Sequence, residues 1–148
     1  MKKLSLTLLL HRKILMRFTK YRVIFEPFAE RHFIKSFAKK YKGAWDFTLG
    51  TIAEEFEKID ALFLKSIAEP ITDKDADIVI CKTEFKISGT QESRHGSGNR
   101  CIVALHKDKG VVRVLLVYGK KDLGHGNETA CWKNFIKKSY PEYYKMLS

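Results

Sequence analysis

The sequence predicts an α+β fold, with an N-terminal strand and a helical hairpin packed on a small antiparallel sheet, plus a C-terminal helix. The order of the elements is the first reason, because two helix-like segments precede three strand-like segments in succession. The second reason is the distribution of charge, because the longer helix-like segment is acidic and the strand-like part of the chain is basic. Residues 44–77 carry three Lys against nine Asp and Glu, whereas residues 82–138 carry twelve Lys and Arg against five acids. A chain of 148 residues with 45% hydrophobic content is expected to form one domain with one core.

The first elements are a strand and a helix. Residues 22–25 (RVIF) form a short apolar run, which indicates a strand. A helix is expected from Ala29, because apolar side chains such as Phe33 and Phe37 recur at intervals of four residues. Gly43 marks its end.

A second, longer helix is expected over residues 44–67. Its apolar side chains recur every three or four residues and form a single stripe. The acidic side chains Glu54, Glu55 and Glu57 lie opposite that stripe, and we interpret them as a solvated helix face rather than an acidic site. Pro70 ends the segment.

Three strands come next. Residues 78–88 alternate, with apolar side chains on one face and Lys82, Glu84 and Lys86 on the other. The other two strands are expected at residues 99–106 and 111–117. The turn at residues 107–110 joins them into a hairpin.

The chain is expected to close with a helix that belongs to the same domain, within residues 124–148. Asn127 suits the N-cap position, the helix runs to about residue 138, and Pro141 ends it.

Residues 1–21 are interpreted as a basic arm that lacks fixed structure, or as a start placed too early, with Met16 as the alternative start. The arm's apolar run is too short to span a bilayer and lacks a small-residue cleavage site, so we expect neither secretion nor a membrane partner. Three cysteines without zinc-binding spacing indicate reduced thiols, a cytoplasmic location and no metal site.

Basic side chains on the strands are the first candidate site. One face of the sheet is expected to be electropositive, and such surfaces attract polyanions, most often nucleic acid. Lys82 and Lys86 stand about 13 Å apart on one strand face, a spacing that suits neighbouring phosphates. The alternative is that they only solvate the open face of a half-buried sheet.

The loop at residues 92–100 holds more functional chemistry than any other window. Arg94 and Arg100 can bind phosphate in a bidentate way, and His95 can exchange protons near neutral pH beside the carboxylate of Glu92. The alternative is a flexible connection with incidental polarity.

A third cluster follows the last strand. Tyr118 could stack on a nucleobase, and Lys120 and Lys121 could neutralise phosphate. Alternatively these lysines are a solvated strand end.

Two motifs point to a family. Residues 25–28 (FEPF) form an aromatic and proline entry after the first strand, and residues 114–123 (VLLVYGKKDL) are an apolar strand that ends in basic residues and Asp. With the helical hairpin between them, the region from Arg22 to Leu123 resembles the RelE/ParE superfamily of bacterial type II toxin–antitoxin toxins.

The resemblance implies a metal-independent messenger RNA endoribonuclease that acts on the ribosome, needs no cofactor and has a cognate antitoxin as its partner. In this chemistry a base activates the ribose 2′-OH, cations stabilise the charged phosphorane and an acid protonates the leaving oxygen. Carried over by position, the scissile phosphate would be bound by Lys86, Arg100 and Arg113. His95 or Glu92 would be the base.

Tyr118 would stack on a base or position it. The remaining expected RNA-binding residues are Lys82, Arg94, Lys120 and Lys121. Position 119 is Gly where many relatives carry His, so His95 or His125 would have to substitute. The C-terminal helix could cover the sheet or dock the antitoxin. The alternatives are a ParE-like gyrase inhibitor without catalysis, a non-enzymatic nucleic-acid-binding protein and a degenerate toxin.

Overall fold

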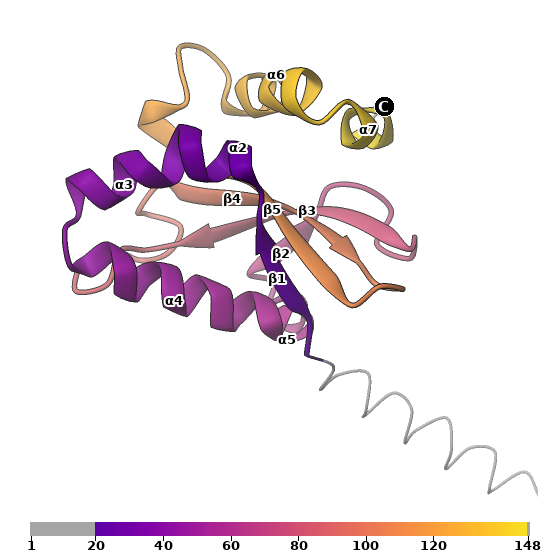
Figure 1. Cartoon of the computed structure of the whole chain (residues 1–148), viewed down its shortest axis with the longest axis horizontal. Coiled ribbons are helices and arrows are strands. Elements are labelled where there is room, and N and C mark those ends of the chain that lie inside the picture. The colour runs from indigo at the N-terminus through magenta and orange to yellow at the C-terminus, as the bar shows by residue number, and fades with distance from the viewer. Residues whose placement is uncertain (1–19, 148) are drawn as a thin grey trace, which may run out of the picture.

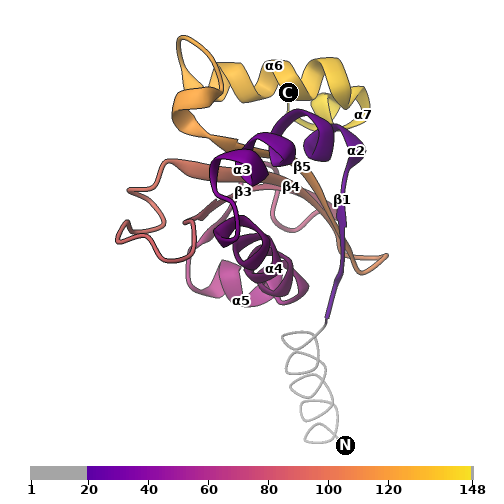
Figure 2. The ribbon, with the colours of Figure 1, turned by 60° about the vertical axis from the view of Figure 1, so that its left-hand side comes forward.

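The computed structural model describes residues 20–147, which form a five-stranded sheet with helices on both faces (Figures 1 and 2). The strand order is β1-β5-β4-β3-β2; β1 runs parallel to β5 and every other pair is antiparallel. The predicted α+β class is confirmed. The strands are β1 (Arg22–Phe25), β2 (Ala68–Pro70), β3 (Ile78–Phe85), β4 (Asn99–His106) and β5 (Val111–Gly119).

The β4–β5 hairpin lies at the centre of the molecule. All eight residues of β4 are buried, and β5 lies between β1 and β4, which confirms the predicted hairpin and interior strand. The turn ends at Gly110, whose φ of +64° favours glycine. Strand β2 is not predicted by the sequence pattern, because an edge strand of three residues is too short to show an alternation. Its Pro70 is tolerated because the outer side of an edge strand needs no ladder hydrogen bond.

Helices α4 (Ala44–Glu57) and α5 (Ile59–Leu64) cover one face of the sheet. The prediction of one continuous helix over residues 44–67 is wrong, because the chain leaves the helical conformation at Lys58, with φ −116° and ψ 41°. The carbonyl of Glu57 instead accepts a hydrogen bond from the Tyr21 amide at 2.9 Å. The break therefore joins the helix end to the residue that precedes β1.

The segment before α4 is also less regular than a single helix. It consists of α2 (Pro27–Ala29), a π-helical turn η1 (Glu30–Ile34) and α3 (Lys35–Lys40). Tyr21, which we assigned to the arm, is buried and its hydroxyl donates to the Asp60 carboxylate at 3.3 Å. Lys20, the other described residue of the predicted arm, pairs with Glu57 at 3.3 Å, and residues 1–19 lie outside the described residues.

Helices α6 (Glu128–Ser139) and α7 (Pro141–Tyr144) pack on the opposite face from α4 (Figures 1 and 2). The predicted N-cap is confirmed, because the Asn127 side chain accepts a hydrogen bond from the Ala130 amide at 3.1 Å. After Pro141 the chain continues into α7 and a short 3-10 turn, η3 (Lys145–Leu147), which we did not predict. Among residues 20–147, no helix has the length and apolarity needed to cross a membrane.

Candidate functional site

A row of polar side chains crosses the sheet on the face that α6 covers. Glu84, Arg100 and Tyr118 are direct cross-strand neighbours on β3, β4 and β5. Because they lie opposite one another in register, their side chains project from the same face. We call the row and its contacting side chains the polar row; its members are Lys82, Glu84, His95, Arg100, Tyr118 and Glu128.

The open end of the polar row is a histidine–carboxylate pair. His95 Nδ1 lies 2.8 Å from Glu84 Oε1, while 84% of the His95 side chain is exposed. A carboxylate only accepts hydrogen bonds, so Nδ1 carries the proton and Nε2 of the neutral ring is left as an acceptor. Among the described residues, nothing pairs with that nitrogen. The pair has the arrangement of a general base oriented by an acid.

Arg100 contacts both residues of this pair. Its guanidinium lies 3.6 Å from the same Glu84 oxygen and donates at 3.2 Å to the His95 carbonyl. Only 4% of its side chain is exposed. Arg100 therefore positions both the carboxylate and the loop. It is too buried to bind a phosphate directly, so the prediction that it binds the scissile phosphate is wrong.

The loop that carries His95 is anchored rather than flexible. Arg94 forms two hydrogen bonds of 2.8 Å to the carboxylate of Glu55 on α4, and these bonds raise the pKa of the guanidinium. The Ser97 hydroxyl donates at 2.6 Å to the Phe85 carbonyl at the end of β3. Two predictions need correction: Arg94 is a structural anchor whose charge is paired, and Glu55 belongs to its ion pair rather than to a solvated face.

Helix α6 contacts the polar row through Glu128. The carboxylate of Glu128, at its first position, accepts from the Tyr118 hydroxyl at 3.0 Å and pairs with Lys82 Nζ at 3.4 Å. Burial is the largest cause that raises the pKa of Tyr118, so this phenol remains a donor. Tyr118 is 1% exposed. Its face cannot receive a stacked base from solvent, contrary to our expectation.

Arg113 does not join the polar row. It lies five residues before Tyr118, about 17 Å along β5, and pairs with Glu26 at 2.9 Å. The predicted phosphate site made of Lys86, Arg100 and Arg113 is therefore wrong in its geometry. Lys86 is exposed just beyond β3, where it lines a hollow of about 160 Å³ beside α4.

Two of the predicted lysines are close to the His95 loop. Lys120 and Lys121 are exposed in the short turn η2 (Lys120–Asp122), and the Lys120 amide donates at 2.7 Å to the Gly98 carbonyl. Glu92 is exposed and takes part in no described contact of the polar row. His125 is exposed in the loop before α6.

The expectation of an open, electropositive sheet face is wrong. Helix α6 covers that face, and four of the expected cations are paired with acids: Lys82, Arg94, Arg100 and Arg113. Glu84 and Glu128 are members of the site that the sequence pattern did not predict. The position of Glu84 on the polar side of its strand was visible in the alternation, but its approach to His95 depends on how the loop folds back.

The described residues give less support to a cysteine nucleophile or to a metal site. Burial raises the pKa of the Cys81 thiol to about 12 and also raises that of Cys101, which disfavours a nucleophilic thiolate at either position. Within residues 20–147, no three or more His, Cys, Asp and Glu side chains come together as a metal site would require.

No family model, curated protein or solved structure matches this chain. Its function therefore has to be inferred from the geometry of the polar row.

Proposed function

We propose that this chain is a toxin of the RelE/ParE type, an endoribonuclease that cuts messenger RNA on the ribosome, with His95 as its general base. The observation that carries the proposal is the His95–Glu84 pair: an exposed imidazole whose Nδ1 is 2.8 Å from a carboxylate. The described residues hold no second histidine in such a setting, because His106 is buried and His32 and His125 contact no carboxylate.

The proposed reaction needs one base and surrounding positive charge. Nε2 of His95 takes the proton from the ribose 2′-OH, the 2′-oxygen forms a bond to the adjacent phosphorus, and the bond from phosphorus to the 5′-oxygen breaks. The products are a 2′,3′-cyclic phosphate and a 5′-hydroxyl, whose oxygen takes its proton from water. Glu84 stabilises the imidazolium that forms after the proton transfer.

Exposed cations beside the His95 loop suit an RNA backbone. Lys120 lies against the loop that carries His95, and Lys121 follows it in the same turn, η2. Their charges would stabilise the phosphorane and attract the polyanion. The order of elements also agrees with the resemblance: a strand, two helical segments, then antiparallel strands.

The same proposal includes a cytoplasmic location and an antitoxin partner. Such a partner would present an acidic, amphipathic segment to the exposed lysines.

A cell-free bacterial translation reaction tests the proposal. Purified protein is added and messenger RNA ends are mapped by primer extension, with and without ribosomes. Ribosome-dependent cuts that disappear with His95→Gln and persist with His125→Gln, a matched change at an exposed histidine, support it.

Intact messenger RNA with normal protein synthesis contradicts the proposal. Growth arrest with DNA damage would then indicate a gyrase inhibitor, and salt-dependent RNA binding without cleavage would indicate a binding protein.

A further inference from the structure

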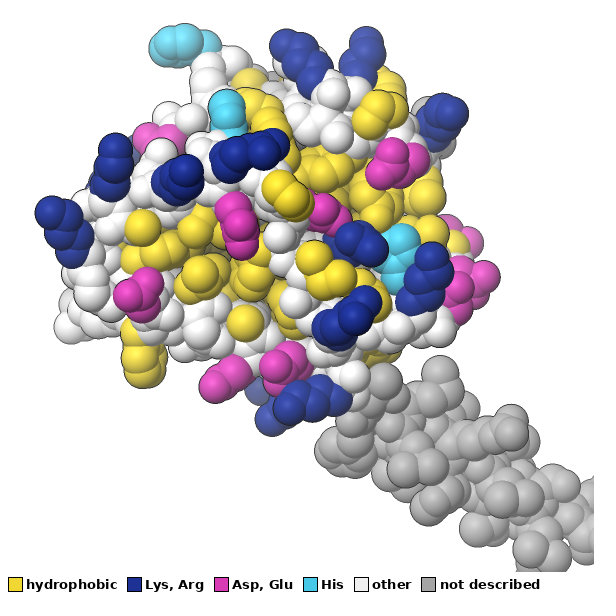
Figure 3. Space-filling view, in the orientation of Figure 1, with side chains coloured by type: hydrophobic (Ala, Val, Ile, Leu, Met, Phe, Trp, Pro, Cys, Tyr) yellow, Lys and Arg dark blue, Asp and Glu magenta, His cyan; other side chains and the backbone are white. Residues whose placement is uncertain are grey.

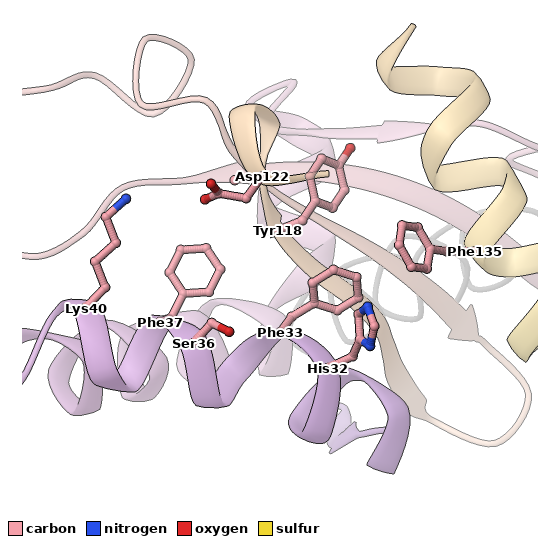
Figure 4. Close-up of a pocket in the computed structure, with 9 residues that line it drawn as sticks. His32, Phe33, Ser36, Phe37, Lys40, Tyr118, Asp122 and Phe135 are labelled. Atoms are coloured by element: carbon pink, nitrogen blue, oxygen red, sulfur yellow. The ribbon is translucent and has the colours of Figure 1, made fainter. Parts of the chain in front are cut away.

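A cavity of about 340 Å³ lies between the first helical segments, η1 and α3, and the end of β5 (Figure 4). We call it the α3 pocket. Its volume is in the range of pockets that enclose a small ligand. Its lining includes Phe33, Ser36, Phe37, Tyr118, Asp122 and Phe135.

The apolar part of the α3 pocket is rigid and aromatic. Phe33 and Phe135 pack edge to face, with their ring centroids 5.4 Å apart, and Phe37 stacks on Trp45 at 4.7 Å. Phe33 and Phe37 are each 8% exposed, so their positions are fixed by the core. Such walls favour a flat aromatic ligand over a flexible one.

The polar part is a carboxylate with no partner among the described residues. Asp122 lies at the end of η2, and its Oδ2 would be only 3.0 Å from a Cβ placed on Gly119, so glycine leaves room for the carboxylate there. Figure 4 shows the Asp122 carboxylate and the Lys40 ammonium group at the same end of the pocket. Asp122 thus offers two acceptor oxygens beside the aromatic walls.

We propose that the α3 pocket binds the guanine base of an RNA substrate, with Asp122 accepting hydrogen bonds from its N1–H and N2–H groups. Guanine presents two adjacent donors that match the two oxygens of a carboxylate. Adenine presents an unprotonated N1 between its donor and C2, and would leave a lone pair facing the carboxylate. Uracil has one N–H between two carbonyl oxygens, and cytosine pairs its donor with an acceptor, so each makes fewer contacts.

The α3 pocket adjoins the polar row, and this inference rests on the proposed function. Tyr118 lines the pocket and lies two strands from Glu84 in the same register row, a distance of about 10 Å. A base in the pocket would therefore belong to a nucleotide close to the phosphate that His95 serves.

One exposed cation, Lys40, lines the α3 pocket, and further cations are exposed on the same helix. These are Lys35 and Lys39, and Figure 3 shows Lys and Arg side chains along α3 and over α6. These groups would hold the backbone of a strand whose base enters the pocket.

Calorimetric titration of the full chain with 5′-GMP and 5′-AMP tests this inference. We expect GMP to bind at least about tenfold more tightly than AMP, because a site built to hydrogen-bond N–H groups rejects an analogue that lacks them. Asp122→Asn should abolish the preference. Glu54→Gln is the matched control: it makes the same change at an exposed carboxylate of α4 and should keep the preference. Ser36→Trp, which fills the pocket from α3, should prevent GMP binding.

Equal binding of the two nucleotides, or a preference that survives Asp122→Asn, would overturn the inference. The outcome is separate from that of the proposed function. A GMP preference that depends on Asp122, in a protein that cuts no RNA, supports the pocket and contradicts the ribonuclease. RNA cleavage without a GMP preference supports the ribonuclease and contradicts the guanine pocket.

Discussion

His95 lies in the loop before strand β4 and His106 is the last residue of that strand, and the two side chains differ in exposure and in the group that each contacts. His95 precedes the strand on an anchored loop, is largely exposed and contacts the carboxylate of Glu84. His106 ends the strand, is 9% exposed, and its Nε2 lies 2.9 Å from the Tyr143 hydroxyl beneath α7. One imidazole is presented to solvent and the other is part of the packing.

The partner of each histidine determines what it can do. A carboxylate stabilises the imidazolium that a general base becomes, whereas a buried hydroxyl does not. Burial, followed by the positive charge of Arg113, lowers the pKa of His106. His106 is therefore held neutral, and we expect it to contribute to stability, while His95 is expected to contribute to activity.

The largest expected effect is that of His95→Ala on RNA cleavage. Loss of a general base typically costs about 10²- to 10⁴-fold in rate, and we expect a fall in that range. Stability should stay the same, because the side chain is exposed. Cleavage rates and urea unfolding curves of the two proteins measure both. A variant that cuts at the wild-type rate would remove His95 from the mechanism.

His106→Ala should have the converse effect. It leaves the buried Tyr143 hydroxyl without its partner and opens a cavity under α7, so we expect a loss of about 1–3 kcal/mol in the free energy of unfolding. Cleavage by the remaining folded protein should be close to wild type. Tyr143→Phe removes the same hydrogen bond and keeps the ring, so it should cost less than His106→Ala; an unchanged urea midpoint in both variants would contradict this role.

Glu84→Gln sharpens the comparison by weakening the partner of His95 while keeping its shape. The amide can no longer stabilise the imidazolium and can turn its NH2 group toward the ring. We expect kcat to fall about 10- to 100-fold with little change in KM, because the ring is misoriented while the RNA-binding lysines remain. Glu92→Gln is the matched control, since that carboxylate contacts no member of the polar row. Equal effects of the two substitutions would rule out orientation by Glu84.

The smallest expected effect is the change that His106 causes in the free energy of unfolding as pH falls. Its pKa is lower in the folded protein than the ordinary value of 6.5, so the unfolded chain binds the extra proton first as pH falls. Stability from this group is complete above pH 6.5 and is lost as pH falls from there through the folded pKa, by at most about 1.4 kcal/mol per pH unit. Urea unfolding of wild type and His106→Gln between pH 5.5 and 7.5 should show a steeper loss on acidification in the wild type. Parallel curves would contradict it.

Local patterns were sufficient to predict most of the fold. The alternation of residues 78–88 predicted β3, and Asn127 marked the start of α6. The break at Lys58 was not visible, because it depends on a hydrogen bond to Tyr21 from a distant part of the chain. The edge strand β2 is likewise recognisable only beside β3.

The candidate site was harder to predict, because its charges are paired over long separations in sequence. His95 was identified from its loop, but the partner that gives it a role, Glu84, is eleven residues away. Arg94 and Arg113 pair with acids 39 and 87 residues away, so residue type alone could not distinguish an anchor from an RNA-binding group.

Analysis of the RNA product ends tests the central claim most directly. Ribosomes programmed with a defined message are incubated with the wild type and with His95→Ala, and the chemical ends of the fragments are determined. We predict 2′,3′-cyclic phosphate and 5′-hydroxyl ends with the wild type, and intact message with the variant. Fragments with 3′-hydroxyl and 5′-phosphate ends, or the same cyclic ends at the same rate from His95→Ala, would contradict the assignment of His95 as the base that activates the 2′-hydroxyl.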